Sequence, residues 1–301
     1  MVIKNILLTG SSGFLGKYIY TQLKTQFELD TLGRNKIDDV CFDFSNDNLC
    51  IGKPYDLVIH CAGKAHVVPK TDNEKRAFFE MNVQGTQFLL NGLEKHIPPK
   101  ALVFVSSVAV YGREFGNLIN EECELLAVDP YGLSKVQAEN LILNWCEKHN
   151  VICTILRLPL VVGTNPPGNL EAMIKGISKG YYFDIAGGTA RKSMVLAKDV
   201  AGIIPKVASI GGIYNLTDGK HPSFSELSLY ISGRLGKSKP FNIPAWIART
   251  VAYAGDLLGS RSPFNSGVFT KITKNLTFDD KKAVNAFGWS PSSVLSDFKI
   301  N

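Results

Sequence analysis

Short apolar runs alternate with longer amphipathic segments through the first half of this chain. The apolar runs, each of a length that suits a β-strand, cover residues 2–9, 27–32, 40–44, 57–61, 101–106 and 151–158. Between them, apolar side chains recur at helical spacing over residues 14–25, 74–95 and 131–149. Strands that alternate with helices in this way predict βαβ units. The expected fold class is therefore α/β, with a doubly wound parallel sheet.

The pattern changes after Gly163. Residues 164–169 form a loop by composition, and the segments that follow are shorter and richer in Gly, Ser and Pro. We expect a smaller α+β part here, with a boundary near residue 165 that divides the chain into residues 1–165 and 166–301, and with chain exchange between the two. Residues 244–258 have apolar side chains at helical spacing. We interpret them as a packed amphipathic helix, with a helix on a membrane surface as the alternative.

The composition is that of a globular protein, since 45% of the 301 residues are hydrophobic and 20% are charged. The formal net charge of +6 suits a partner that carries phosphates. It is too small and too dispersed to indicate nucleic acid. The six cysteines form no CxxC pair, which predicts reduced thiols in a cytoplasmic protein. The chain has no run of about 18 uncharged apolar residues, so neither a membrane span nor a membrane partner is expected.

A glycine-rich turn lies where the first strand meets the first helix. Gly10 permits a tight turn, Gly13 lets the backbone approach a pyrophosphate, and Gly16 lets the helix lie close to the strand. The N-terminus of that helix offers free N–H groups and the positive end of its dipole to phosphates. This junction, followed by a βαβ pattern, predicts a dinucleotide site in the first part of the chain.

The glycine spacing is G-x-x-G-x-x-G, and with it the chain resembles the extended short-chain dehydrogenase/reductases, the sugar-nucleotide epimerase/dehydratase group. Further marks occur in the same order along the chain, namely Asp43-Phe44, Cys61-Ala62-Gly63 and the segment Asn82-Val83-Gln84-Gly85-Thr86. The resemblance implies a Rossmann-type sheet with a small C-terminal substrate-binding part. The cofactor-binding residues that it implies are Gly10, Ser12, Gly13, Phe14, Leu15, Gly16, Asp43, Phe44, Cys61, Ala62, Gly63, Asn82, Tyr131, Lys135 and Pro159.

The end of the second strand bears on the choice of cofactor. An acidic residue there binds the ribose hydroxyls of NAD, whereas an arginine can pair with the 2′-phosphate of NADP. Arg34 stands at the position where the resembled family has its discriminating residue. NADP(H) is therefore favoured, with NAD(H) as the alternative. Asp30, inside the strand, is a weaker candidate for the ribose, and a solvated loop charge is the other interpretation of Arg34.

Three residues form the candidate catalytic group. Tyr131 and Lys135 are four residues apart at the start of a helix, which puts both side chains on one face. A cation one turn away is expected to favour the phenolate and so to make the tyrosine usable for proton transfer. In the resembled family the lysine also holds the nicotinamide ribose. The same resemblance implies that Ser107, at the end of the fifth strand, donates to the reacting oxygen, whereas Ser106 points elsewhere.

Cationic residues of the second half are candidates for holding the substrate. The resemblance implies that Lys192 binds a nucleotide diphosphate, with Arg191 as its possible substitute and Arg261 as a second clamp. Residues expected to line the substrate pocket are His66, Ser107, Val108 and Asn169. Leu160 stands where UDP-galactose-type epimerases often have an asparagine. The five histidines are scattered, and no metal site is expected.

The function implied by the resemblance is NAD(P)-dependent chemistry at C4 of a nucleotide-diphosphate sugar. We expect 4-keto reduction or 4-epimerisation of a UDP-(N-acetyl)hexosamine-type substrate in the synthesis of surface-polysaccharide precursors. A homodimer is the expected assembly. One alternative is a UDP-glucose/galactose-type 4-epimerase with bound NAD. Another, from a different class, is a non-catalytic NADP-sensing or RNA-associated protein of the same fold. Dehydration is disfavoured, because Val108 and Ala109 supply no carboxylate after the serine. Residues 278–291 are interpreted as a structural seal.

Overall fold

A computed structural model describes residues 1–34, 37–42, 49, 51–65, 68–259, 262 and 264–300. Four residues named above as candidates, Asp43, Phe44, His66 and Arg261, lie outside the described residues. No helix in the part of the chain that the structure describes is long and apolar enough to cross a membrane.

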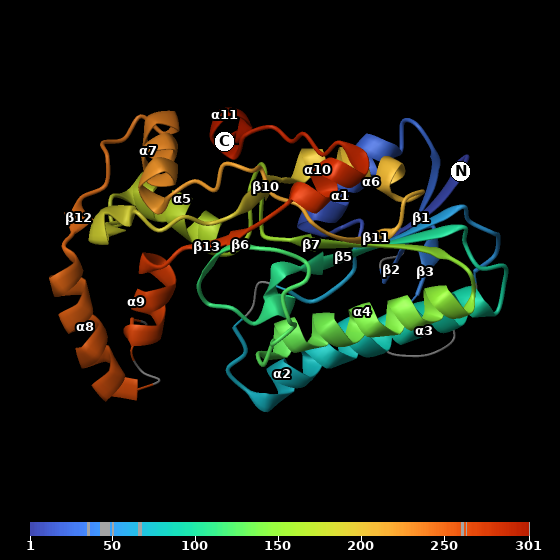
Figure 1. The fold of residues 1–301 in the computed structure, drawn as a ribbon, viewed down its shortest axis with the longest axis horizontal. Coiled ribbons are helices and arrows are strands. Elements are labelled where there is room, and N and C mark those ends of the chain that lie inside the picture. The colour runs from blue at the N-terminus through green and yellow to red at the C-terminus, as the bar shows by residue number, and fades with distance from the viewer. Residues whose placement is uncertain are drawn as a thin grey trace.

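The centre of the molecule is a parallel sheet of seven strands (Figure 1). The strands are β1 (Asn5–Thr9), β2 (Glu28–Gly33), β3 (Val40–Cys41), β4 (Leu57–His60), β5 (Ala101–Ser107), β7 (Ile152–Leu158) and β11 (Gly212–Asn215). Their spatial order is β11-β7-β5-β4-β1-β2-β3, and every neighbouring pair is parallel. The inner strands are apolar on both faces because helices cover both; all four residues of β4, for example, are buried. This confirms the predicted fold class.

Helices cover the two faces of the sheet (Figure 1). One face is covered by α1 (Phe14–Leu23), α6 (Ala197–Val207) and α10 (Lys281–Phe287), and the other by α2 (Asp72–Phe79), α3 (Gly85–Glu94) and α4 (Pro130–Lys148). Each layer has its own apolar core against the sheet. The strand order reverses between β1 and β4, so the carboxyl ends of these strands and of β5 form the edge where a ligand binds in doubly wound sheets.

One predicted helix is interrupted in the structure. The segment predicted as a helix over residues 74–95 starts earlier, at Asp72, where Thr71 and Glu74 form a capping box. It then contains a π-helical turn, η1 (Glu80–Gln84), before α3 begins. Such turns mark functional sites in many helices, and this one carries Asn82.

The C-terminal part is made of short elements, some of which share a third apolar core. They are α5 (Asn169–Lys179), β9 (Asp184–Ile185), η3 (Ala186–Gly188), β10 (Met194–Leu196), α7 (Phe224–Arg234), β12 (Asn242–Ile243), α8 (Ala245–Leu258), α9 (Ser266–Thr273), β13 (Leu276–Phe278) and α11 (Val294–Asp297). Three further elements precede residue 165 but lie against this part, namely η2 (Val108–Tyr111), β6 (Gly116–Ile119) and β8 (Leu160–Val162). Three two-stranded sheets, β10–β8, β12–β9 and β13–β6, hold these elements together. Helices α8 and α9 lie at the end of the molecule farthest from β1–β3 (Figure 1).

The chain returns to the central sheet after residue 165. Helix α6 and strand β11 follow the elements of the smaller part, and α10 follows β13, yet all three lie at the sheet. The last segment is fixed there, because Trp289 Nε1 donates to the Thr217 carbonyl at 2.9 Å and Phe278 stacks on Tyr111. Both parts of the chain therefore contribute strands to the central sheet and helices that cover it.

Candidate active site

The glycine turn has no space for side chains. Gly10 has a φ of +76°, and a Cβ on it would lie 2.6 Å from the Ala62 nitrogen. A Cβ on Gly16 would lie 1.9 Å from the Gly10 carbonyl oxygen, so helix α1 approaches the turn as closely as glycine allows. Gly13 is the N-cap of α1 and offers no capping side chain, which leaves the first N–H groups of the helix available to an anion. These features fit the pyrophosphate of a dinucleotide.

A chain of buried hydrogen bonds holds the loop after β4, which contains Ala62 and Gly63. The Thr86 hydroxyl donates to the Asn82 carbonyl at 2.6 Å, so it accepts from His60 Nε2 at 2.9 Å. His60 Nδ1 then accepts from the Thr9 hydroxyl at 2.7 Å, and the Thr9 oxygen accepts from the Ala62 N–H. Burial lowers the pKa of His60 to about 3, which keeps it neutral. His60 therefore has a structural role, in line with its predicted place in a strand.

Asn82 joins this loop to helix α4. Its Oδ1 accepts from the Lys64 N–H at 2.7 Å, while its Nδ2 donates to the Lys64 carbonyl at 3.1 Å and to Ser134 Oγ at 2.9 Å. A Cβ on Gly63 would lie 3.0 Å from Asn82 Oδ1 and 3.3 Å from Lys135 Nζ. Asn82 thus fixes the loop after β4 beside Lys135. Gly63, which has no side chain, leaves room there for a cofactor.

The candidate catalytic residues come from two neighbouring elements. Ser107 ends β5, while Tyr131 and Lys135 lie one turn apart at the start of α4. The helix begins here because Asp129 caps it, accepting from the Gly132 N–H at 3.0 Å, and because Pro130 occupies its first position. Lys135 Nζ donates to the Val105 carbonyl at 3.0 Å, which fixes the ammonium group beside the end of β5.

Burial governs the electrostatics of this group. Lys135 is only 5% exposed, and burial lowers its pKa to about 8. Burial also raises the pKa of Tyr131, and the hydrogen bond with Ser107 only partly opposes this rise. We predicted that the neighbouring cation would favour the phenolate; in the protein alone, loss of solvation and the charges of Asp129 and Cys61 instead raise the pKa of Tyr131. Tyr131 is therefore protonated at neutral pH in this structure.

A single cleft of about 850 Å³ collects most of the predicted site residues. Those that line it are Gly13, Phe14, Leu15, Gly16, Cys61, Gly63, Ser107, Val108, Tyr131, Lys135, Pro159, Asn169 and Lys192. Gly10, Ala62 and Asn82 shape the turn and the loop from behind, as described above. Ser106 also lines the cleft, but its hydroxyl is occupied, since it donates to Glu139 at 2.5 Å. The cleft thus joins the glycine turn, the catalytic group and a cation of the smaller part.

The end of β2 carries charges of both signs. Arg34 is exposed there, and so is Ser12 in the glycine turn. Asp30 contacts Lys53 at 2.8 Å and Tyr55 at 2.7 Å. A residue that sequence reasoning missed, Asp38, accepts from Ser11 Oγ at 3.2 Å and lies against the Cα of Gly33. No motif marks Asp38, since only the fold returns it to the turn.

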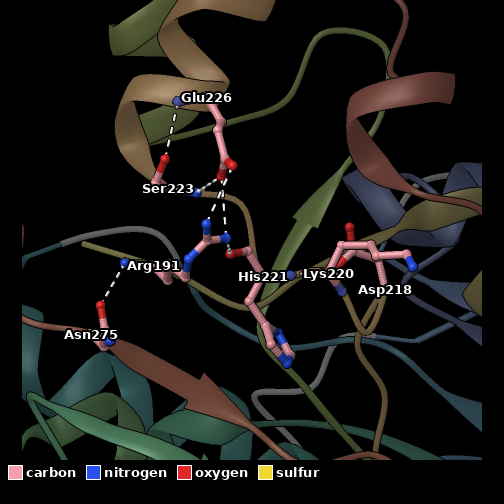
Figure 2. Close-up of polar contacts among 7 residues, drawn as sticks. All are labelled: Arg191, Asp218, Lys220, His221, Ser223, Glu226 and Asn275. Atoms are coloured by element: carbon pink, nitrogen blue, oxygen red, sulfur yellow. Dashed lines mark hydrogen bonds and ion pairs between the residues drawn. The ribbon is translucent and has the colours of Figure 1, made fainter. Parts of the chain in front are cut away.

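Arg191 and Lys192, the two adjacent cations predicted to bind the substrate, have different neighbours in the structure. Lys192 lines the cleft, where its Nζ donates to the Lys274 carbonyl at 3.0 Å and burial lowers its pKa to about 8. Arg191 does not line it. Its guanidinium donates to both carboxylate oxygens of Glu226 at 3.3 Å and to the His221 carbonyl at 3.0 Å (Figure 2). Arg191 therefore holds the start of α7, and of these two adjacent residues Lys192 is the one that lines the cleft.

Sequence reasoning also missed an ion pair that crosses the cleft. Lys271 of α9 lies 3.1 Å from Glu114, which follows η2, and both residues line the cleft. Neither occurs in a recognisable spacing, so the sequence held no signal for the pair. The other carboxylate of the lining, Asp129, caps α4. Both carboxylates thus have partners in the described structure.

A comparison with protein families identifies the chain. Residues 6–216, more than half of its length, match the model of the NAD dependent epimerase/dehydratase family. The chain belongs to this family. The protein is thus an enzyme that depends on an NAD-type dinucleotide, and the residues of the glycine turn fit that cofactor by the contacts given above.

Relatives of this family member extend over nearly the whole chain. It is 26% identical to the UDP-glucose 4-epimerase of Vibrio cholerae, over 98% of this chain and 93% of that protein. It is 27% identical to the N-acetyl-alpha-D-glucosaminyl-diphospho-ditrans,octacis-undecaprenol 4-epimerase of Escherichia coli O157:H7, over 97% and 92%. A solved structure of RMD from Pseudomonas aeruginosa complexed with NADPH has the same fold, with a TM-score of 0.73 at 20% identity, over 97% of this chain and 95% of the other.

Proposed function

We propose that this protein interconverts C4 epimers of a sugar carried on a diphosphate. The observation that carries the proposal is the single cleft, in which the glycine turn, the Ser107–Tyr131–Lys135 group and Lys192 face the same space. Both relatives described above are named as 4-epimerases. Their named substrates differ, but each is a hexose linked to a diphosphate, which is the part of the ligand that Lys192 suits.

The proposed roles follow from the contacts of each side chain. Tyr131 first loses its own proton to solvent; as the phenolate it then takes the proton of the C4 hydroxyl during oxidation and returns it during reduction. Ser107 holds the same oxygen while its charge changes. Lys135 uses one N–H on the Val105 carbonyl and keeps the others for the cofactor ribose. When bound, the dinucleotide supplies a reversible hydride acceptor, and the wall of the cleft formed by Leu15, Pro159 and Leu160 excludes water from that side.

The test follows cofactor and sugar together. UDP-glucose and UDP-N-acetylglucosamine are incubated with the purified enzyme, and the C4 configuration is followed by proton NMR while absorbance reports NAD(P)H. Epimerisation changes the sugar with no net change in cofactor. A Tyr131→Phe variant is expected to lose about 10²–10⁴ in kcat. Tyr181→Phe, an exposed tyrosine away from the cleft, is the matched control and keeps full activity. A Tyr131→Phe variant as active as the parent contradicts the proposed role.

A second candidate function has its own observation. Arg34 stands exposed at the end of β2, where a cation suits the 2′-phosphate of NADP(H), and Leu160 replaces an asparagine of UDP-galactose-type epimerases. Both features favour a 4-keto reductase. Repeating the experiment above with NADPH and a UDP-4-keto sugar separates the two candidates, because a reductase consumes one NADPH for each 4-keto sugar and produces no C4 epimer from the parent UDP-sugar.

The preference between NAD and NADP is a further proposal. Arg34 favours NADP(H), which we propose as the cofactor, whereas the carboxylate of Asp38 beside Ser11 opposes a 2′-phosphate. Arg34→Ala is expected to shift selectivity toward NAD, and Asp38→Asn toward NADP. Dissociation constants of both dinucleotides for the two variants measure the shift.

A further inference from the structure

Helix α8 is built with its large apolar side chains on the outside. The residues that face the rest of the protein are small, namely Ala248, Ala252 and Gly255. A Cβ on Gly255 would lie 1.9 Å from the Phe264 carbonyl oxygen, so the helix is held close by its small face. The apolar residues exposed on α8 and just before it are Phe241, Trp246, Ile247, Val251, Tyr253, Leu257 and Leu258, which we call the α8 apolar face.

Several side chains of the α8 apolar face are largely exposed to solvent. Leu257 is 91% exposed, Phe241 81% and Trp246 71%. Phe241 is held by the β12–β9 pair, where its carbonyl accepts from the Asp184 N–H at 2.9 Å. Contiguous exposed apolar surface of this kind marks an interaction site in a soluble domain. The cleft and its chemistry do not explain why these side chains are exposed.

The charge around this face selects the partner. Residues 234–274 contain seven Lys and Arg and one Asp, a net charge of +6, which equals the formal net charge of the entire chain. The rest of the chain carries 26 residues of each sign, because the totals are 33 and 27. The positive charge that we took as dispersed is thus concentrated in the segment that contains α8, although Lys271 of this segment is paired with Glu114 in the cleft. Two copies joined through this face would bring two such segments together, and their repulsion disfavours a dimer here.

An apolar helix face surrounded by cations is the arrangement of helices that lie in the interface of an anionic membrane. Tryptophan suits that interface, since its ring is apolar and its N–H is polar. We propose that the α8 apolar face docks on the surface of a membrane that contains anionic lipids, with Trp246 and Leu257 inserted and Lys237, Lys239 and Arg249 toward the headgroups. This takes up the alternative interpretation of residues 244–258 over the expectation of no membrane partner, and it does not depend on the proposed function.

The position of α9 connects this face to the active site. Residues Lys271 and Ile272 of α9 line the active-site cleft, while Phe269, Thr270 and Thr273 line a groove of about 380 Å³ against α8. The same groove is bordered by Arg249 and Lys274. One short helix therefore separates the cleft from the groove beside the docking surface. Docking through α8 would place the cleft within one helix of the membrane surface.

The test uses the intact protein and the fluorescence of its own tryptophans. Trp145 and Trp289 are buried, so Trp246 is the tryptophan whose environment docking changes. Vesicles of phosphatidylcholine alone are compared with vesicles that also contain phosphatidylglycerol. We expect the anionic vesicles to sediment with the protein and to shift its emission to the blue, and brominated lipid to quench it. Replacing Lys237 or Lys239 with alanine is expected to lower the partition coefficient about fivefold each.

Two variants make the result specific. A Leu257→Glu/Leu258→Glu variant is expected to lose vesicle binding while keeping its circular dichroism and its binding of dinucleotide. Val284→Glu, which changes an exposed apolar residue of α10, is the matched control and keeps vesicle binding. Binding that survives the double change, or no binding to anionic vesicles at low salt, overturns the proposal. So does light scattering that shows a dimer dissociated by Leu257→Glu/Leu258→Glu, because a second copy would then be the occupant.

Discussion

Adjacent residues can serve different purposes because an extended backbone sends neighbouring side chains to opposite sides. Arg191 bridges to Ser223 and Lys192 to Leu276, so the two cations meet different neighbours. We predict that Lys192→Ala raises the KM for the diphosphate sugar about tenfold or more, the order of one lost charge-assisted hydrogen bond. Arg191→Ala is the matched control and changes KM less. Steady-state kinetics decide, and equal effects would contradict the assignment of Lys192.

The lowered pKa of Lys135 makes stability depend on pH. Its folded pKa is about 8 and the ordinary value is 10.5, so the unfolded state binds more protons between those values. Stability from this residue therefore rises as the pH rises from about 8 to 10.5. Lys135→Met is expected to remove this contribution, on the order of 3 kcal/mol at most. Urea unfolding of both proteins at several pH values measures the difference. A difference that does not change across this range would contradict the buried state of Lys135.

Single residues were predictable where a motif fixed both type and position. Ser107, Tyr131 and Lys135 share one cleft, as the spacing of Tyr131 and Lys135 and, for Ser107, the family resemblance led us to expect. Asp38 and the Glu114–Lys271 pair could not be predicted from the sequence. Only the folded chain brings Asp38 to the glycine turn and Lys271 to Glu114 at the cleft. The direction of the pKa shift of Tyr131 was also beyond the sequence, since it depends on the extent of burial.

At the scale of elements, the junction of β1 with α1 depends on close contact of backbones. Gly16→Ala would put a methyl group 1.9 Å from the Gly10 carbonyl oxygen, so helix α1 must move. We predict at least a tenfold loss of dinucleotide affinity, because the N–H groups of the turn move with the helix. Gly52→Ala, at an exposed glycine with nothing within 4 Å of the new methyl group, is the control and leaves affinity unchanged. Isothermal titration with NAD and NADP checks both variants.

Elements were predictable where one periodicity extends over many residues. The helix predicted over residues 131–149 is observed as Pro130–Lys148, within one residue of the prediction at each end. The helix predicted over 74–95 is interrupted at Glu80–Gln84, since Asn82 makes contacts with Lys64 and Ser134 that no local pattern encodes. Tertiary contacts, and not helix propensity, decide the shape of that segment.

At the scale of the whole molecule, a buried polar network joins the sheet to the C-terminal segment. Arg157 of β7 pairs with Glu139 of α4 at 2.7 Å, and both are almost completely buried. Arg157 also donates to the Tyr111 hydroxyl, which donates to Asn215 of β11. The Asn215 side chain then donates to the carbonyls of Ile119 and Asp279. The network thus connects elements from both parts of the chain.

We predict that Glu139→Gln destabilises the protein by about 3–5 kcal/mol, because it leaves the buried Arg157 without a countercharge. Asp72→Asn, which breaks the exposed pair with Lys75, is the control and costs less than about 1 kcal/mol. Adding Arg157→Met to Glu139→Gln is expected to restore part of the loss. Denaturant unfolding monitored by circular dichroism gives the three values, and a Glu139→Gln variant of parental stability would argue against a buried charged pair.

The return of the chain to the sheet has a consequence for biosynthesis. Strand β7 is complete at Leu158, but its neighbour β11 is not made until residue 215, and Trp289 comes later still. While the ribosome is still adding the smaller part, the edge of β7 has no partner, and unpaired edges invite aggregation. A fragment that ends near residue 165 would keep this open edge permanently. This connectivity therefore leaves the edge of β7 open during synthesis until residues 212–215 have been made.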